Sequence, residues 1–263
     1  MDFFTTRKIF PWLYSLKDPN NVFCYLLIGE EKALLFDTAY GIGDLPEAVR
    51  KITDKPLTVV LSHAHVDHAC GAYQFNEVFM HEADFSVCEI HTCEEYRREA
   101  VKEMASNGIP LPDSFDRDAY YKAGTGNLKK LEIGRVFDLG GLNPEVIQME
   151  GHTPGSIGLL VREFKVLLDG DAANSHIWMF LPESLPISEY IAMLERTMLL
   201  DFDKFIVGHS DEPLPKSDML NYLSAARNAN MEKAKPYRIF PQFGGYLYQE
   251  SSAGIVFNES KLG

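Results

Sequence analysis

The feature that most constrains this chain is a group of four polar side chains directly behind an apolar segment. Residues 57–61 have the composition of a buried strand, and residues 63–68 read His-Ala-His-Val-Asp-His. In a tight turn, neighbouring imidazoles and a carboxylate converge on one metal ion, while the intervening alanine and valine pack beneath them. The pattern therefore predicts a metal site at the end of a strand. Its candidate ligands are His63, His65, Asp67 and His68.

Three further segments end apolar stretches in the same kind of residue. Residues 151–156 read Gly-His-Thr-Pro-Gly-Ser, whose proline and glycines favour a turn that presents the histidine. Residues 167–171 end in acids, and residues 205–209 end in a histidine. Because α/β proteins gather their functional loops at the carboxyl ends of strands, we expect these segments to share one rim. The added candidates are His152, Asp171 and His209.

The order of elements along the chain favours an α/β fold with a helical insertion. An apolar hairpin at 22–37, a helical pattern at 43–53 and the strand at 57–61 form a β-α-β unit. Residues 82–128 mix charges with helical spacing and are expected to form a helical insertion. The second half repeats the same element types. Its expected strands are 135–138, 146–149, 158–161, 166–168 and 205–207, its expected helices 187–200 and about 216–235, and its expected hairpin 245–249 with 255–258.

Composition limits the partners and the compartment. Lys and Arg number 25 against 38 Asp and Glu, and the net charge of -13 disfavours a nucleic-acid surface. The four cysteines show no C-x-x-C spacing, which favours reduced thiols in a cytoplasm. No apolar run approaches the roughly 18 residues of a membrane span, and the start lacks a signal-peptide pattern. We expect one cytoplasmic domain over residues 1–263, with a small-molecule substrate and no contact with nucleic acid or membrane.

Taken in order, the motifs H-x-H-x-D-H, G-H-T-P-G, G-D and G-H resemble the motif series of the metallo-β-lactamase superfamily over nearly the whole chain. The resemblance implies an αββα sandwich, in which two mixed β-sheets pack face to face with helices outside. It implies two divalent metal ions, with zinc as the first expectation and iron or manganese as alternatives. It also implies that Asp37 orients the ligand loop without touching metal. By the same resemblance, the first ion is bound by His63, His65 and His152, the second by Asp67, His68 and His209, and Asp171 bridges both.

Departures from family patterns narrow the expected activity. Zinc β-lactamases generally lack a bridging aspartate, which this chain has at Asp171, and flavodiiron members carry Glu where His65 stands. The added domain or arm of the superfamily's nucleases fits neither the length nor the acidic charge. What remains resembles the glyoxalase II and lactonase branch, whose members cleave esters, thioesters or lactones. The glutathione-binding basic residues of glyoxalase II have no clear counterpart here, so a glutathione thioester is one candidate among several.

The resemblance implies hydrolysis through a metal-bound hydroxide. Asp67 is then placed to take a proton from the attacking water. His176 is a candidate proton donor to the leaving group, with a solvent-facing side chain as the equal alternative. Cys70 is expected to be structural, and His81 and His91 are expected to be structural or solvated.

Two other functions stay open at this point. An iron-dependent persulfide dioxygenase shares the fold with a single iron, although the complete second ligand set argues against it. A regulatory protein that keeps the metal site without turnover is the third reading. The insertion at 82–128 can either cover the metal rim and shape the pocket or form the surface of a homodimer.

Overall fold

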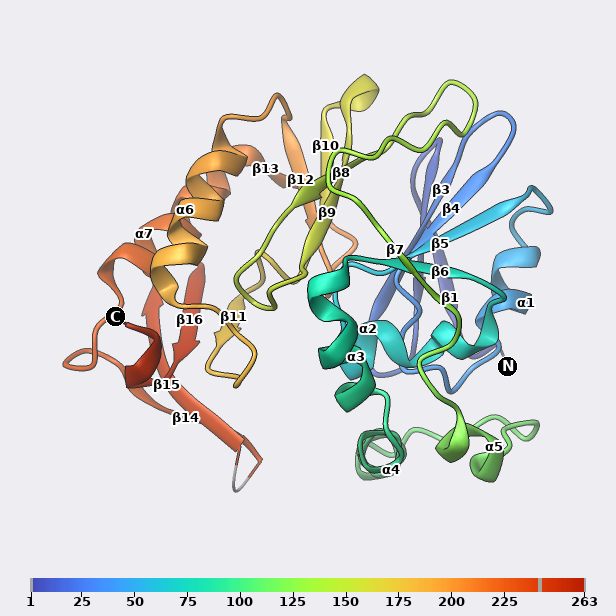
Figure 1. Ribbon diagram of the computed structural model, residues 1–263, viewed down its shortest axis with the longest axis horizontal. Coiled ribbons are helices and arrows are strands. Elements are labelled where there is room, and N and C mark those ends of the chain that lie inside the picture. Colours follow the sequence, from blue (N-terminus) through green and yellow to red (C-terminus); the bar gives the residue numbers. More distant parts are fainter. Residues whose placement is uncertain (1, 241–242, 263) are drawn as a thin grey trace.

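The computed structural model describes residues 2–240 and 243–262, and its strands lie in layers with helices on the outer sides (Figure 1). The first layer, within this described part, is a seven-stranded mixed sheet whose strands follow one another in sequence order. Its first four strands pair antiparallel, and the predicted hairpin is confirmed as the third and fourth. The fourth to seventh strands pair parallel, so the fourth strand has one antiparallel and one parallel neighbour. These strands are β1 (Thr5–Phe10), β2 (Leu13–Lys17), β3 (Phe23–Ile28), β4 (Ala33–Phe36), β5 (Leu57–Val60), β6 (Val78–Met80) and β7 (Leu128–Lys130).

The first parallel pair is joined by a crossover through α1 (Leu45–Arg50). Asp44 caps this helix, because its Oδ1 accepts a hydrogen bond from the Glu47 backbone N–H at 2.8 Å. Pro46 lies in the first turn, where a missing N–H leaves no intrahelical bond unmade. The crossover brings β5 beside β4. The carboxyl end of β5, which leads into the histidine loop, therefore lies inside the sheet and not at its edge.

The strands of the second half are divided between two mixed sheets. In the described residues, five strands pair in the order β13-β12-β10-β9-β8 and four in the order β11-β16-β15-β14. The predicted terminal hairpin is confirmed as β15 and β16, and β11 adds to it in parallel. The five strands are β8 (Glu145–Gln148), β9 (Ile157–Val161), β10 (Val166–Gly170), β12 (Lys204–Val207) and β13 (Leu214–Pro215). The four are β11 (His176–Met179), β14 (Lys235–Phe240), β15 (Phe243–Glu250) and β16 (Ala253–Phe257).

Buried apolar side chains join these layers. Phe36 and Val60 of the seven-stranded sheet pack in one cluster with Leu168 and Ile206 of the five-stranded sheet. The helices α6 (Ile187–Met198) and α7 (Met219–Asn228) cover the outside of the second half and share a second cluster with strands of both smaller sheets (Figure 1). The arrangement confirms the α/β sandwich of mixed sheets flanked by helices.

A helical insertion between β6 and β7 is confirmed. It contains α3 (Phe85–His91), α4 (Glu94–Ser106) and α5 (Arg117–Lys122). Arg97 of α4 is fully buried and holds the insertion in place. Its guanidinium donates hydrogen bonds to the carbonyl oxygens of Cys70, Thr92 and Gly124 at 2.8–3.0 Å. One of these bonds reaches Cys70, two positions after His68, so the insertion is tied to the candidate site.

Two expected elements are shorter than the sequence pattern indicated. The prediction of a helix over about 216–235 was wrong for its second half, because α7 ends at Asn228 and β14 begins at Lys235. The Asn230 side chain donates to the Asn228 carbonyl at 2.7 Å, a local bond that competes with the helix, and Pro236 favours an extended residue before it. The strand expected at 135–138 is reduced to a bridge between Val136 and Glu145.

The structure bears on two further expectations only in part. Among the described residues, no helix is both long enough and apolar enough to cross a membrane. The single domain over 1–263 stays a prediction, and residues 1, 241–242 and 263 of it lie outside the described residues.

Candidate metal centre

The seven candidate ligands come from loops and turns that follow strands. His63 and His65 lie in the loop after β5, and Asp67 and His68 lie on the short helix α2 (Val66–Ala69) that this loop enters. The remaining three follow the second-half strands β8, β10 and β12. The structure therefore brings residues from both halves of the chain to one place. The three are His152, Asp171 and His209.

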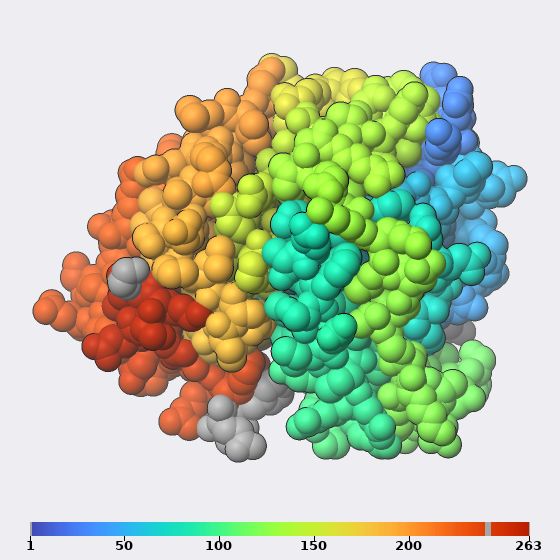
Figure 2. All heavy atoms as spheres, in the orientation of Figure 1, coloured from blue at the N-terminus to red at the C-terminus, as the bar shows by residue number. Residues whose placement is uncertain are grey.

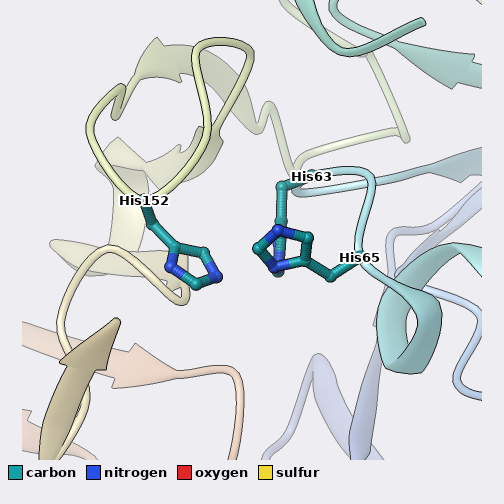
Figure 3. A group of neighbouring side chains, drawn as sticks. All are labelled: His63, His65 and His152. Carbon is teal, nitrogen blue, oxygen red and sulfur yellow. The ribbon is translucent and has the colours of Figure 1, made fainter. Parts of the chain in front are cut away.

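Three histidines form the first set. The candidate ligand atoms of His63, His65 and His152 lie within 4.8 Å of one another, and all three residues are buried. Figure 3 shows the three imidazoles converging from the histidine loop on one side and the turn after β8 on the other. The ring centroids of His65 and His152 are 4.4 Å apart and those of His63 and His65 are 4.7 Å apart. These separations leave room for one cation between the rings.

A carboxylate and two histidines form the second set. The candidate ligand atoms of Asp67, His68 and His209 also lie within 4.8 Å of one another. Asp67 Oδ2 is 3.4 Å from His209 Nε2 and 3.5 Å from His68 Nε2. His68 is fully buried, while the side chains of Asp67 and His209 are partly open. The second set therefore faces the solvent more than the first.

Asp171 lies between the two sets. Its Oδ2 is 3.9 Å from His152 Nε2 and 3.2 Å from His209 Nε2, and its Oδ1 is 3.5 Å from His68 Nε2. It also groups with His63 and His68 as a third trio of metal-competent atoms. All seven predicted ligands are thus brought together, and their assignment to a first ion, a second ion and a bridge stays a prediction.

Hydrogen bonds fix which ring nitrogen stays free in three of the imidazoles, those of His63, His68 and His152. The Ser62 hydroxyl donates to Asp37 Oδ2 at 2.8 Å, so it can only accept from His63 Nδ1, 2.9 Å away. The Nδ1 atoms of two other histidines face acceptors that have no hydrogen, which leaves Nε2 for a ligand. These pairs are His68 Nδ1 with Asp37 Oδ2 at 2.9 Å and His152 Nδ1 with the Trp178 carbonyl at 2.8 Å.

The atoms left free by these bonds are buried and unpartnered. Among the described residues, Nε2 of His63, His68 and His152 and Oδ1 of Asp171 have no hydrogen-bond partner. A buried polar group without a partner costs about 1–3 kcal/mol, so four that converge are costly unless a ligand satisfies them. Their chemistry, imidazole nitrogen with carboxylate oxygen, fits a divalent metal ion.

Burial dominates the electrostatics of the first set. It lowers the pKa of His65 to about 3, and the neighbouring His152 adds to the effect. Burial and then the proximity of His68 hold the pKa of His63 well below its ordinary value. These two rings are neutral at physiological pH, which is the state that a metal ion needs.

Carboxylates dominate the electrostatics of the second set. Burial acts against the protonated form of His209, but Asp171 outweighs it and raises the pKa to about 9. For His68, burial is likewise outweighed, first by Asp67 and then by Asp171, and the pKa is raised well above its ordinary value. Without an ion, these imidazoles hold protons at neutral pH.

Asp37 contacts the histidine loop as expected from outside the ligand sets. Its backbone φ of 70° is an uncommon conformation for a non-glycine residue, and its carboxylate is fully buried. Oδ1 accepts the Ser62 backbone N–H at 2.6 Å, and Oδ2 faces the Ser62 hydroxyl and His68. The carboxylate therefore fixes both the loop backbone and one imidazole.

Asp84 is a supporting residue that sequence reasoning missed. This buried carboxylate accepts the backbone N–H of Ala64 at 3.0 Å, the Thr153 hydroxyl at 2.7 Å and the backbone N–H of Gly155 at 2.6 Å. It ties the histidine loop to the turn that carries His152. No local signal marks it in the sequence, because Asp84 lies in a charged helical stretch without a motif.

Gly208 allows the second half to approach the ligands closely. A β-carbon at this position would lie 2.3 Å from Asp171 Oδ1 and 3.0 Å from His68 Cε1. No real side chain tolerates such contacts. The glycine of the G-H motif is therefore needed for space at the site itself.

A cavity of about 360 Å³ opens beside the two sets. Part of its wall comes from the insertion, through Glu103 of α4, and part from the second half, through His176, Trp178 and Tyr237. His176 is half-buried, and its Nε2 lies 3.1 Å from Gln249 Oε1. The structure thus brings His176 to the cavity wall, which is also lined by five of the seven candidate ligands: His65, Asp67, His152, Asp171 and His209.

The less favoured candidates have structural surroundings. Cys70 is fully buried, and burial raises the pKa of its thiol to about 12, so it stays protonated. His81 Nδ1 accepts the Ala83 backbone N–H at 3.4 Å at the start of a short helical turn. His91 is buried and not solvated, and its Nε2 lies 3.0 Å from Glu183 Oε1, a contact that the sequence did not indicate.

Comparisons with known proteins agree with the fold. A family model described as the metallo-beta-lactamase superfamily matches residues 18–229. Acyl-coenzyme A thioesterase MBLAC2 of Homo sapiens is 30% identical over 210 residues, which cover 72% of this chain and 73% of that protein. Hydroxyacylglutathione hydrolase GloC of Haemophilus influenzae is 28% identical over 153 residues, which cover 56% of this chain and 65% of that protein.

A solved structure shows the same fold. The metallo-beta-lactamase family protein TTHA1429 from Thermus thermophilus matches with a TM-score of 0.62 and 20% identity, covering 84% of this chain and 81% of that one. The family model spans most of the chain, and the relatives in sequence are named as a thioesterase and a hydrolase. The chain therefore belongs to the metallo-β-lactamase superfamily and is one of its hydrolases.

Proposed function

We propose that this hydrolase uses two metal ions to cleave the thioester bond of a small acyl compound, with esters and lactones as alternative substrates. The observation that carries the proposal is the convergence of seven metal-competent side chains around Asp171. A single tetrahedral ion takes four ligands, so seven exceed its needs. In this proposal His63, His65 and His152 hold the first ion, Asp67, His68 and His209 hold the second, and Asp171 bridges them.

The free atoms of the site support metal occupancy. Imidazole nitrogen and carboxylate oxygen suit zinc, and they also suit iron and manganese; we take zinc as the first choice. When bound, two such ions supply Lewis acidity that polarises an acyl carbonyl and acidifies water. The side chains of Asp67 and His209, in the second set, are partly exposed. In this proposal, water reaches the ions from that side.

Asp67 is the proposed acceptor of the proton from the attacking water. Burial by itself would raise the pKa of this carboxyl, but the charge of His68 and then of His209 outweighs burial, and the pKa is lowered. The carboxylate is therefore ionised at neutral pH. It lines the cavity, where substrate and water meet.

His176 is the proposed proton donor to the leaving group. It stands on the cavity wall with Nε2 against Gln249 Oε1, and its ring packs edge-on against Tyr237 at a centroid distance of 5.5 Å. A protonated imidazole at this point of the cavity wall can give its proton to a departing thiolate or alkoxide.

The cavity supports a small and uncharged acyl portion. Among the described residues that line it, none is a lysine or arginine, and Tyr40, Trp178 and Tyr237 provide aromatic surface. The relatives that act on thioesters favour this bond type over an oxygen ester or a lactone. No observation favours an iron-dependent dioxygenase, and the assembled second ligand set counts against it.

The surroundings of the site extend the proposal. Glu103 places the insertion at the cavity wall, which supports a covering role for it over a homodimer surface. We also propose a reducing compartment such as the cytoplasm, supported by four cysteines that form no disulfide among themselves.

The test combines metal analysis with a substrate panel. The protein, purified without added metal, is analysed for zinc, iron and manganese, and is then assayed against short acyl thioesters, esters and lactones. We expect two ions per chain, turnover of thioesters that chelation abolishes, and no oxygen consumption. One tightly bound ion that supplementation does not increase, or oxygen uptake with a persulfide and no acyl cleavage, would overturn the proposal. Metal binding without any turnover would favour a regulatory protein.

A further inference from the structure

A carboxylate outside the predicted ligands connects three separate parts of the chain. Glu183 Oε1 lies 2.9 Å from His65 Nε2 and 3.0 Å from His91 Nε2. His65 belongs to the loop after β5, His91 to α3 of the insertion, and Glu183 to the segment between β11 and α6. All three side chains are largely buried, with exposed fractions of 7%, 9% and 14%. Figure 2 shows the insertion and the segment before α6 meeting on one face of the molecule.

The chemistry of this contact fixes the state of His65. A carboxylate oxygen accepts hydrogen bonds, so both imidazoles place their hydrogen on Nε2 toward Glu183. For His65, this leaves Nδ1 as the ring nitrogen that is free to bind a ligand. His63 and His152 keep Nε2 free instead, because their Nδ1 atoms are bound by a hydroxyl and a carbonyl. Glu183 therefore determines which atom His65 adds to the first set.

His91 in turn holds Glu183. Its ring packs against Tyr96 of α4 at a centroid distance of 4.6 Å and against His65 at 4.5 Å. A carboxylate that accepts from two fixed imidazoles has little freedom to rotate, so the ring of His65 is fixed as well. Because His91 and Tyr96 belong to α3 and α4, the insertion contributes to the geometry of the first set.

We propose that Glu183, held by His91, is a positioning residue that presents His65 Nδ1 to the first metal ion and couples the insertion to the occupancy of that site. This inference rests on the proposed metal centre. A different reading is a third ion between His65, His91 and Glu183, whose candidate ligand atoms also lie within 4.8 Å of one another. The two short contacts favour positioning, because both have hydrogen-bond length and Glu183 Oε1 is the acceptor in each.

Glu183→Gln is the variant that tests this role, with Glu189→Gln as its matched control. Gln keeps the size of the side chain but removes the charge that strengthens both hydrogen bonds. Glu189 is an exposed glutamate six positions further along, at the start of α6. The affinity of each ion is measured by chelator competition with Co²⁺, together with its visible absorption and the thermal unfolding of metal-free protein. We expect Glu183→Gln to weaken the first ion about 10- to 100-fold and to alter the Co²⁺ spectrum, while the second ion and the control stay unchanged.

A pair of His91 variants separates positioning from packing. His91→Phe keeps the aromatic ring against Tyr96 but has no N–H, whereas His91→Gln keeps an N–H close to the position of Nε2. We expect His91→Phe to weaken the first ion about 10-fold and His91→Gln to recover most of that loss. Glu183→Ala, which has neither charge nor acceptor, should weaken the first ion at least as much as Glu183→Gln.

Three results would overturn the inference. A Glu183→Gln variant that lowers thermal stability but leaves the first ion's affinity unchanged has lost packing only. Equal loss in His91→Phe and His91→Gln would show that the donor is irrelevant. A third Co²⁺ equivalent in the unaltered protein, lost in the Glu183 and His91 variants, would show a third metal site. If the unaltered protein binds no metal, it is instead the proposed function that fails.

Discussion

The two ligand sets lie side by side with Asp171 between them, yet His63 and His65 differ in charge from His68 and His209 before an ion binds. The first set contains only imidazoles, so burial decides, and the pKa of His65 falls to about 3. The second set includes Asp67, and Asp171 outweighs burial at His209, whose pKa rises to about 9. The same residue type thus becomes a neutral ligand in one set and a proton carrier in the other, according to the carboxylates around it.

This difference has a consequence for loading. At His63 and His65 a cation displaces no proton, whereas His68 and His209 must give up the protons that neutralise the carboxylates before a cation binds. Loading of the second set is therefore an exchange of protons for a cation. Substitutions at the ligands test this contrast most directly, beginning with the residue that belongs to both sets.

Asp171→Ala is expected to have the largest effect. Both ions should bind more weakly, and kcat/KM should fall on the order of 10³-fold or more, because the shared ligand and the charge that stabilises both ions are lost. Metal analysis and turnover measure this, with Asp203→Ala, an exposed carboxylate, as the control. If only one ion is lost, Asp171 belongs to a single set and the bridge is wrong.

Single substitutions in each set should separate the two ions. His152→Ala should weaken only the first ion and His209→Ala only the second, each by more than about 100-fold, since loss of a ligand exceeds loss of its supporting contact. Titration with Co²⁺ followed by absorption distinguishes the two. Variants that each lose both ions equally would mean that the sets do not act as separate sites.

His176→Ala tests whether a residue outside the two ligand sets takes part in the reaction. If His176 donates the proton, kcat should fall about 10²-fold while both ions remain bound at their original affinity. The assay compares thioesters whose leaving groups differ in pKa, and the loss should be smallest for the most acidic leaving group. An unchanged kcat across the series would make His176 part of the cavity wall only.

The affinity for the second ion should depend on pH more steeply than the affinity for the first. His209, with a pKa raised to about 9, is protonated below that pH and must lose its proton, so the second ion binds more tightly as pH rises toward 9. The gain is about 10-fold per pH unit for each displaced proton. His65, with a pKa lowered to about 3, is already neutral, so it adds no such dependence above about pH 5. Calorimetric titration in buffers of different ionisation enthalpy counts the released protons. Equal counts for the two ions would contradict the contrast.

Cys70→Ala should have the smallest effect, although Cys70 lies only two positions after His68 of the second set. Its thiol is buried and stays protonated, so kcat/KM should be unchanged and stability should fall by about 1 kcal/mol. Steady-state kinetics and denaturant unfolding check both. A large loss of turnover with intact metal content would point to a nucleophilic or supporting role that the structure does not indicate.

The convergence of the candidate ligands was predictable from sequence, because each one follows an apolar strand within a few residues. Local composition shows both the strand and the polar residue that ends it, as in residues 57–68. The hairpin of β3 and β4 and the insertion were predictable for the same reason. Where a local pattern continued past the true end of an element, as beyond Asn228, the prediction failed because Asn hydrogen bonds and Pro236 compete with the helix.

The supporting residues were not predictable, because their partners are far away in the chain. Glu183 lies 118 positions from His65, and Asp84 lies 69 positions from Thr153. Neither carboxylate belongs to a motif, and from sequence alone each is indistinguishable from a solvated surface residue. The parallel pairing of β11 with β16, which carries His176 to the cavity, is equally invisible to local patterns. The sequence thus indicates the ligands but not the contacts that orient them.

Asp84 joins the two ligand loops through hydrogen bonds to Ala64, Thr153 and Gly155, none of which involves a ligand atom. The polypeptide itself therefore ties the two loops together. In practical terms, the protein is suited to metal-substitution experiments. We expect that the proposed ions can be removed and replaced in turn by cobalt, manganese or iron, and that differences in rate among the reloaded forms then report the cation.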